Sequence, residues 1–443
     1  MAFSLPLDLL SLILKFVMIG DAAPLSLKTI QACSLVSQTW CTFSRPHLFR
    51  FIQITLSKAD TEKWLQRLKN ATHLIPLIEH VTLIPWNAMR QVEWEGDVAE
   101  ELGRRLSHVH SVTLAGPFMS NTMIRNLDPH LAFLKYLGAA KGGLHSLKLQ
   151  VHVQFERPDQ LFRYLYSTPG RPRHLSILSA GCYSHDAQNY LDTGIVASTT
   201  EGLKSAWPLE SLVLYETEIR SGVLSWLLSP AVDLSDLRSF AIATSGFLNA
   251  DDSNLDQNAI PMLEELLVSV GPSLRQLTLG TYQGNLNAFP VPFISHLQAL
   301  KQLVLVSEDD YESGLSPHDG ISYALQLLPH LHGQSSLEEI VLAVDIQANN
   351  RLSISHVVEL ADWEALDRAL DASSIHSFRR LFVLVTVMFT DFERRCLDEA
   401  ERIIRGAMPR LAGKGLLDVR AEFLTVHRTK ALYHSWSLPN ESV

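Results

Sequence analysis

A short apolar pattern that returns ten times after residue 70 constrains the fold of this chain more than any other feature. The pattern is apolar-x-x-apolar-x-apolar, and its last positions alternate as the residues of a β-strand do. It recurs about every 33 residues, with steps of about 26 to 41, which indicates a repeat architecture. The copy at 175–177 keeps only two of the apolar positions. The copies lie at residues 78–83, 109–114, 144–149, 175–177, 209–214, 237–242, 274–279, 300–305, 337–342 and 378–383.

Most gaps between these strands have the apolar periodicity of amphipathic helices. Glycine or proline often separates a helix from the next strand, as at Gly142-Gly143 and Gly271-Pro272. Helix–turn–strand units repeated in this way stack into a curved solenoid with a parallel sheet on its inner face. The predicted helices cover residues 97–106, 129–137, 159–166, 261–270, 321–328, 357–370 and 391–405.

The repeated units resemble a leucine-rich-repeat horseshoe, which is an α/β fold. The chain departs from that family in two respects. The repeats are longer than the usual 20–29 residues, and the Asn or Cys expected after the second leucine of the strand is mostly missing. The number of repeats and their boundaries therefore stay open.

Alternation along each strand predicts which side chains face the inner surface of the solenoid. The later repeats are apolar at these positions, which favours either an exposed groove for a protein target or a face covered by a C-terminal segment. Both interpretations stay open. Thr113 and Ser176 share this inner face. The candidate substrate-facing residues are Lys148, Val213, Tyr215, Thr278, Val304, Val306, Val341, Phe382 and Leu384.

The N-terminal segment from Leu5 to Val17 is apolar on nearly every side of the helix that it predicts. Pro6 and Asp8 are typical of a first helical turn. Only Asp8, Ser11 and Lys15 are polar, which leaves one narrow polar stripe. A helix of this kind must be buried on more than one side. Because its own small module can cover only one side, the remaining surface predicts contact with a partner protein.

This segment and the residues that follow it form a longer motif, which reads Leu5-Pro6-x-Asp8-Leu9-Leu10-x-x-Ile13-Leu14-x-x-Val17 and then Cys33-x-Leu35-Val36-x-x-x-Trp40. The motif resembles an F-box, whose helices bind a Skp-type adaptor and through it a cullin–RING ubiquitin ligase. One departure is the long link from Met18 to Leu27, where the family often has an acidic-Leu pair. The resemblance implies adaptor contacts for Leu5, Pro6, Leu9, Leu10, Ile13, Leu35, Val36 and Trp40.

The predicted domains are residues 1–47, an F-box-like helical module, and residues 48–443, a leucine-rich-repeat-like solenoid. The resemblance implies a substrate-recognition subunit of a Skp–cullin–F-box ubiquitin ligase that binds an unidentified protein target. An alternative is a repeat scaffold without a ligase, in which the N-terminal helices form a solenoid cap. A membrane-surface helix is disfavoured because Lys15 is the single basic residue on the polar stripe.

Several classes of protein are disfavoured by the sequence. It has no G-x-S-x-G, G-x-G-x-x-G, H-E-x-x-H or Walker-type glycine loop, so we expect neither an enzyme nor a cofactor. A net charge of −10 argues against nucleic-acid binding. No apolar run reaches the length of about 20 residues that a transmembrane helix needs. Asp8, Lys15 and the missing basic flank argue against a signal peptide, so a cytoplasmic or nuclear location is expected.

The cysteine and histidine patterns predict no metal site. Cys33, Cys41, Cys182 and Cys396 contain no C-x-x-C pair, and we expect free thiols in a reducing compartment. His108-x-His110 has a spacing that allows chelation, at the start of a predicted strand. Because no Cys or carboxylate stands near this pair in the sequence, we expect it to be a surface pair.

Overall fold

In the computed structural model, the chain divides into two compact units. Unit 1 contains Met1–Pro172 and Ser179–Ala187, and unit 2 contains Arg173–Leu178 and Gln188–Val443. The predicted domain boundary at residues 47 and 48 falls inside unit 1, near the end of its N-terminal helices. The structure describes residues 9–10, 12–14, 23–85, 95–115, 122–124, 128–137, 143–150, 153–155, 158–168, 170–178, 181–182, 206–215, 220–245, 259–282, 292–309, 318–331, 336–346, 358, 361–373, 375–387 and 394–423.

The main sheet contains twelve strands in the order β1-β2-β3-β5-β7-β10-β12-β13-β14-β15-β16-β17, and its pairs are parallel. All ten strands predicted from the apolar pattern are present, and β1 precedes them. The pattern does not predict β17, because Lys414 occupies the place of its first apolar residue. The strands are β1 Phe51–Leu56, β2 His80–Pro85, β3 Ser111–Ala115, β5 Ser146–Gln150, β7 His174–Leu178, β10 Ser211–Tyr215, β12 Ser239–Ser245, β13 Gln276–Tyr282, β14 Gln302–Asp309, β15 Glu339–Ile346, β16 Arg380–Val387 and β17 Leu417–Phe423.

Two smaller sheets accompany the main one. The strands β4 (Thr122–Ile124), β6 (Val153–Phe155) and β8 (Gly181–Cys182) form a parallel three-stranded sheet in unit 1. In unit 2, β9 (Trp207–Pro208) pairs with β11 (Val232–Asp233). These short pairings lie in the connections between strands of the main sheet, so the connections are themselves partly ordered.

Helices fill the connections between the strands of the main sheet. None of the helices in the described ranges is long and apolar enough to cross a membrane. The α-helices are α2 Ala23–Ser34, α3 Gln38–Phe49, α4 Lys58–Asn70, α5 Gly96–Arg105, α6 Asp128–Leu134, α7 Pro158–Ser167, α9 Arg220–Leu227, α10 Ala259–Val270, α11 His318–Leu327, α13 Trp363–Asp371, α14 Arg394–Ala407 and α15 Pro409–Gly413. Short 3-10 helices are η1 Thr72–Leu77, η5 Pro292–His296 and η6 Leu328–Leu331.

The predicted helices agree closely with the observed ones, except for the helix predicted over residues 357–370. Val358 is helical, but residues 361 and 362 are not, and α13 begins at Trp363. Asp362 is the N-cap residue of α13, because its carboxylate accepts a hydrogen bond from the N–H of Ala365 at 2.9 Å. Residues 391–393 of the last predicted helix lie outside the described residues.

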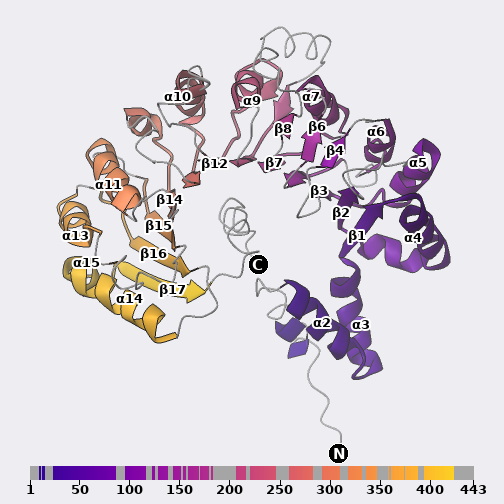
Figure 1. Cartoon of the computed structure of the whole chain (residues 1–443), viewed down its shortest axis with the longest axis horizontal. Helices are drawn as coiled ribbons and strands as arrows, with labels where there is room; N and C mark the ends of the chain where they lie inside the picture. Colours follow the sequence, from indigo (N-terminus) through magenta and orange to yellow (C-terminus); the bar gives the residue numbers. More distant parts are fainter. Residues whose placement is uncertain are drawn as a thin grey trace, which may run out of the picture. The chain divides into compact units, whose positions relative to one another are not determined.

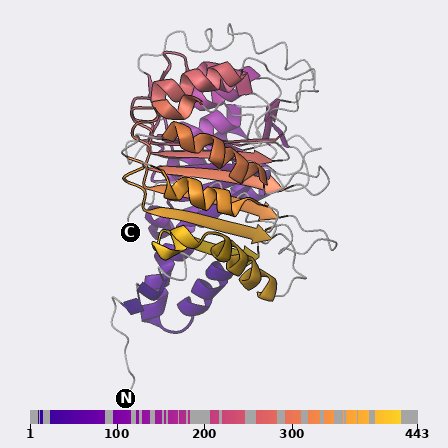
Figure 2. The ribbon, with the colours of Figure 1, turned by 90° about the vertical axis from the view of Figure 1, so that its left-hand side faces the viewer.

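The main core of each unit lies between the strands and their helices. In unit 1, α4 contacts β1 and α5, and α5 contacts α6. In unit 2, α11 contacts β14 and β15, and α14 contacts β17 (Figure 1). Figure 2 shows the orange and yellow helices of unit 2 lying across one face of their strands. The apolar residues of the repeated pattern are buried, as the sequence predicts, except for the half-buried Phe378.

A repeated hydrogen-bond arrangement aligns neighbouring strands. We call the residue immediately before a strand of the main sheet the anchor residue. The carbonyl of the anchor residue Arg50 accepts hydrogen bonds from the N–H groups of Glu79 and His80, both at 3.0 Å. This carbonyl thus bonds the next anchor residue and the first residue of the next strand, which fixes the register. The same arrangement recurs at the carbonyls of Glu79, His110, Arg173, Glu210, Arg238, Arg275, Lys301 and Glu338.

We expect the buried carboxylate of Asp367, which is 2% exposed, to stabilise the C-terminal part of unit 2. Its oxygens accept the N–H groups of Arg410 and Leu411, at 3.1 and 2.9 Å, in the first turn of α15. Asp367→Ala should lower the free energy of unfolding by about 1–3 kcal/mol, because both N–H groups lose their acceptor. Urea denaturation measures the change. Glu364→Ala, an exposed carboxylate on the same helix, is the matched control, and equal losses in the two variants would contradict this role.

Burial of His130 on α6 predicts a pH-dependent contribution to stability. Burial lowers the pKa of His130 to about 4, and the ring of the buried Tyr164 lies edge-on at 6.3 Å. The unfolded chain therefore binds a proton first as the pH falls below about 6.5, so stability decreases from there down to about pH 4. Between pH 7 and pH 5 the wild type should lose about 2 kcal/mol more than His130→Gln does. Urea denaturation at both pH values measures this, with the exposed His73→Gln as control, and equal losses in wild type and His130→Gln would disprove it.

Candidate partner-binding surfaces

The N-terminal helical module has a small core of its own. Residues 9–10 and 12–14 are helical and precede α2 and α3, which contact each other. Leu10, Leu14 and Ile30 are buried. Leu10 and Leu14 are four residues apart, so they lie on the same face of their helix. The Ser37 hydroxyl accepts the N–H of Trp40 at 3.2 Å and caps α3.

The same module exposes large apolar side chains. Leu9 is 45% exposed and Leu12 is 52% exposed, and these residues are three apart on one helical face. Leu35 and Val36, between α2 and α3, are 86% and 68% exposed. Outside this module, the described residues include only Phe51 and Val268 as exposed large hydrophobic side chains. This concentration on one small module is typical of a protein-binding surface.

The candidate adaptor-binding residues that the structure describes therefore divide into three groups. Leu9, Leu35 and Val36 are exposed. Ile13 and Trp40 are half-buried. Leu10 is buried in the module's own core, so its side chain is not accessible to a partner in this conformation. Leu5 and Pro6 lie outside the described residues.

In unit 2 the candidate substrate-facing residues share one sheet face, and most of them are buried. Val213, Thr278, Val304 and Val341 occupy one register position, which continues to the half-buried Phe382. The structure therefore presents no exposed apolar groove at these described positions. Leu384 is also buried on this face. The hydrophobic cluster here contains Leu178, Val213, Tyr215, Ala241, Ala243, Val304, Val306, Val341 and Ala343, with Phe382 packed against it.

The inner face of unit 1 differs, because it is polar and partly open. Gln53, Thr82, Thr113 and Lys148 occupy one register position across β1, β2, β3 and β5. Gln53 is exposed and the other three are half-buried. Burial lowers the pKa of Lys148 below its usual value. We call these four residues the polar strip, and they offer hydrogen-bonding groups to a partner where the apolar cluster of unit 2 does not.

Comparison of the chain with models of known protein families gave no match, and a search of curated proteins gave none either.

The surroundings of His110 correct the prediction that no carboxylate lies near the His108-x-His110 pair. His110 Nε2 lies 3.5 Å from the Glu79 Oε2 atom, although the two residues are on different repeats. Burial would raise the pKa of Glu79, but the hydrogen bond from Arg50 and the charges of Arg50 and His110 hold it below its usual value. Burial, with the nearby charges of His110 and Arg50, lowers the pKa of His80 to about 4.

A buried hydroxyl in the apolar cluster face of unit 2 gives a test of that face. Thr278 is 0% exposed, and its Oγ1 atom has no hydrogen-bond partner among the residues that the structure describes. Thr278→Val keeps the shape and removes the unpaired polar group, so it should raise the free energy of unfolding by about 1 kcal/mol or more. Urea denaturation measures the change. The half-buried Thr113→Val in unit 1 should have little effect, and a loss of stability in Thr278→Val would show that the hydroxyl is paired.

Proposed function

We propose that this chain is a substrate-recognition subunit of a Skp–cullin–F-box ubiquitin ligase. Its N-terminal helical module binds a Skp-type adaptor, and its repeats bind a protein target. The observation that supports the proposal most strongly is the exposure of Leu9, Leu12, Leu35 and Val36 on that module. Leu9, Leu35 and Val36 are also among the residues to which the F-box resemblance assigns adaptor contact.

The repeats support the second half of the proposal. Parallel strands alternating with helices are consistent with an irregular leucine-rich-repeat horseshoe, a form that offers an extended binding surface. We infer that the target contacts the polar strip of unit 1, because Gln53 is exposed and the other three residues are only half-buried, whereas the inner positions of unit 2 are mostly buried. A receptor of this kind contributes proximity and orientation to a ligase reaction, so it requires no catalytic residue.

The alternative is a repeat scaffold whose N-terminal helices close the end of the solenoid. A cap of this kind presents a polar outer face to water. The exposed side chains of Leu9 and Leu12 are apolar, which favours the adaptor-binding interpretation.

Paired substitution of Leu9 and Leu12 by Asp tests adaptor binding. The full chain should co-purify with a co-expressed Skp-type adaptor, and the double variant should bind it at least about 30-fold more weakly, because two charges replace apolar contacts. Binding is measured by titration calorimetry with purified adaptor. Leu10 is left unchanged, since a charge there would disrupt the module's core.

The matched control is Val268→Asp, which changes an exposed apolar side chain on α10, outside the module. It should bind the adaptor as the wild type does. A wild-type chain that does not bind the adaptor, or a Leu9/Leu12 variant that binds it equally well, would favour the scaffold.

A further inference from the structure

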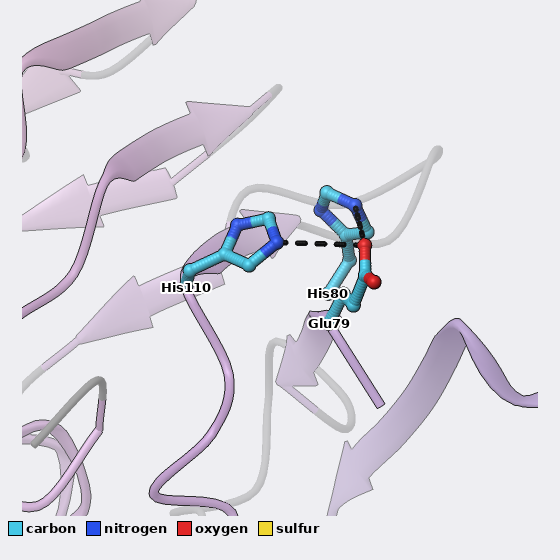
Figure 3. Close-up of side chains that lie close together, drawn as sticks. All are labelled: Glu79, His80 and His110. Carbon is cyan, nitrogen blue, oxygen red and sulfur yellow. Dashed lines mark ion pairs between the residues drawn. The ribbon is translucent and has the colours of Figure 1, made fainter. Parts of the chain in front are cut away.

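Three potential metal ligands converge in unit 1, at the start of β2 and β3. Glu79 is the anchor residue of β2, His80 is the first residue of that strand, and His110 is the anchor residue of β3. His110 Nε2 and His80 Nε2 lie 3.5 and 3.9 Å from Glu79 Oε2. The three ligand atoms all lie within 4.8 Å of one another, and Figure 3 shows both imidazoles directed toward the carboxylate.

We propose that Glu79, His80 and His110 form a zinc-binding site. Two imidazole nitrogens and one carboxylate are a ligand set that zinc accepts, with a fourth position left for water or a partner's side chain. Zinc bonds of about 2.0–2.1 Å in a tetrahedron place ligand atoms about 3.3 Å apart. The distance between His110 and Glu79 already approaches that value, so small side-chain rotations complete the site.

The surrounding contacts hold the ligands in place. The carbonyl of Glu79 accepts the N–H groups of His110 and Ser111 at 3.1 and 3.2 Å, which fixes the two anchor residues side by side. Phe51 stacks on the His80 ring with centroids 4.5 Å apart. The His80 and His110 rings meet edge to face at 4.9 Å. All three ligand side chains are half-buried, so an ion can reach them from water.

The contact between Arg50 and Glu79 distinguishes a zinc site from an ordinary ion pair. Its Nε atom donates to Glu79 Oε2 at 2.8 Å, so its charge and the metal ion would compete for one carboxylate. Removal of Arg50 should therefore tighten zinc binding, whereas removal of any of the three ligands should weaken it. A site that serves only as an ion pair between repeats would show neither effect.

The test is a calorimetric titration of the purified, metal-free full chain with zinc chloride. His80→Ala, His110→Ala and Glu79→Gln should each weaken binding at least about tenfold. His108→Ala, a half-buried imidazole two residues from His110, is the matched control and should bind zinc as the wild type does. Arg50→Gln should bind more tightly than the wild type.

Thermal unfolding of the metal-free variants identifies any that fail to fold, and a ligand variant that fails is replaced by His110→Gln. Equal zinc affinity in the wild type and in folded ligand variants would overturn the proposal, as would weaker or unchanged binding by folded Arg50→Gln. Any zinc binding that survives in His110→Ala at wild-type strength would belong to other ligands, including the free thiols Cys33 and Cys41. The result is independent of adaptor binding, because it uses none of the residues of the N-terminal module.

Discussion

The paired hydrogen bonds at the anchor carbonyls are the constraint on which the repeats depend. At nine anchor residues the carbonyl bonds two consecutive N–H groups of the next repeat, so these strands stay in register whatever the length of the connection between them. This explains how steps of about 26 to 41 residues fit one parallel sheet. It also stacks anchor side chains at the strand spacing of about 4.8 Å. Opposite charges then pair along the sheet, as Lys301 does with Glu338 at 3.0 Å.

The strands could be predicted well because their apolar residues face a core in every repeat, and burial imposes the same alternation each time. Helix boundaries that a single polar contact determines could not be predicted in this way. The start of α13 depends on the carboxylate of Asp362. Asp is a common N-cap residue, but the apolar period of 3.6 residues continues across it, so periodicity alone does not place the start there. The strand β17 lacks one apolar residue of the pattern and still pairs with β16. The backbone of β16 provides the hydrogen-bonding partners for this pairing, and they do not depend on the sequence of β17.

In the candidate sites, too, the features set by local sequence could be predicted, and the features set by tertiary contacts could not. Local periodicity predicted a helix that is apolar nearly all round, but it could not tell that Leu10 faces the module's core while Leu9 faces water. Alternation placed Val213 and Val304 on the inner face, but burial there depends on tertiary packing. The meeting of His110 with Glu79 depends on the register between two repeats, which no sequence motif records.

The exposed side chains of the N-terminal module limit how strongly the proposed adaptor complex could bind. Complete burial of Leu9, Leu12, Leu35 and Val36 would contribute at most about 6–12 kcal/mol, at about 1.5–3 kcal/mol each. These side chains are already partly covered, so the true gain is smaller. Association costs about 4–15 kcal/mol in lost freedom of motion, which is of similar size. These four side chains would not produce a tight complex alone, so the proposed adaptor complex would also need half-buried groups such as Ile13 and Trp40. With so small a margin, loss of the apolar contacts of Leu9 and Leu12 would weaken the proposed complex strongly.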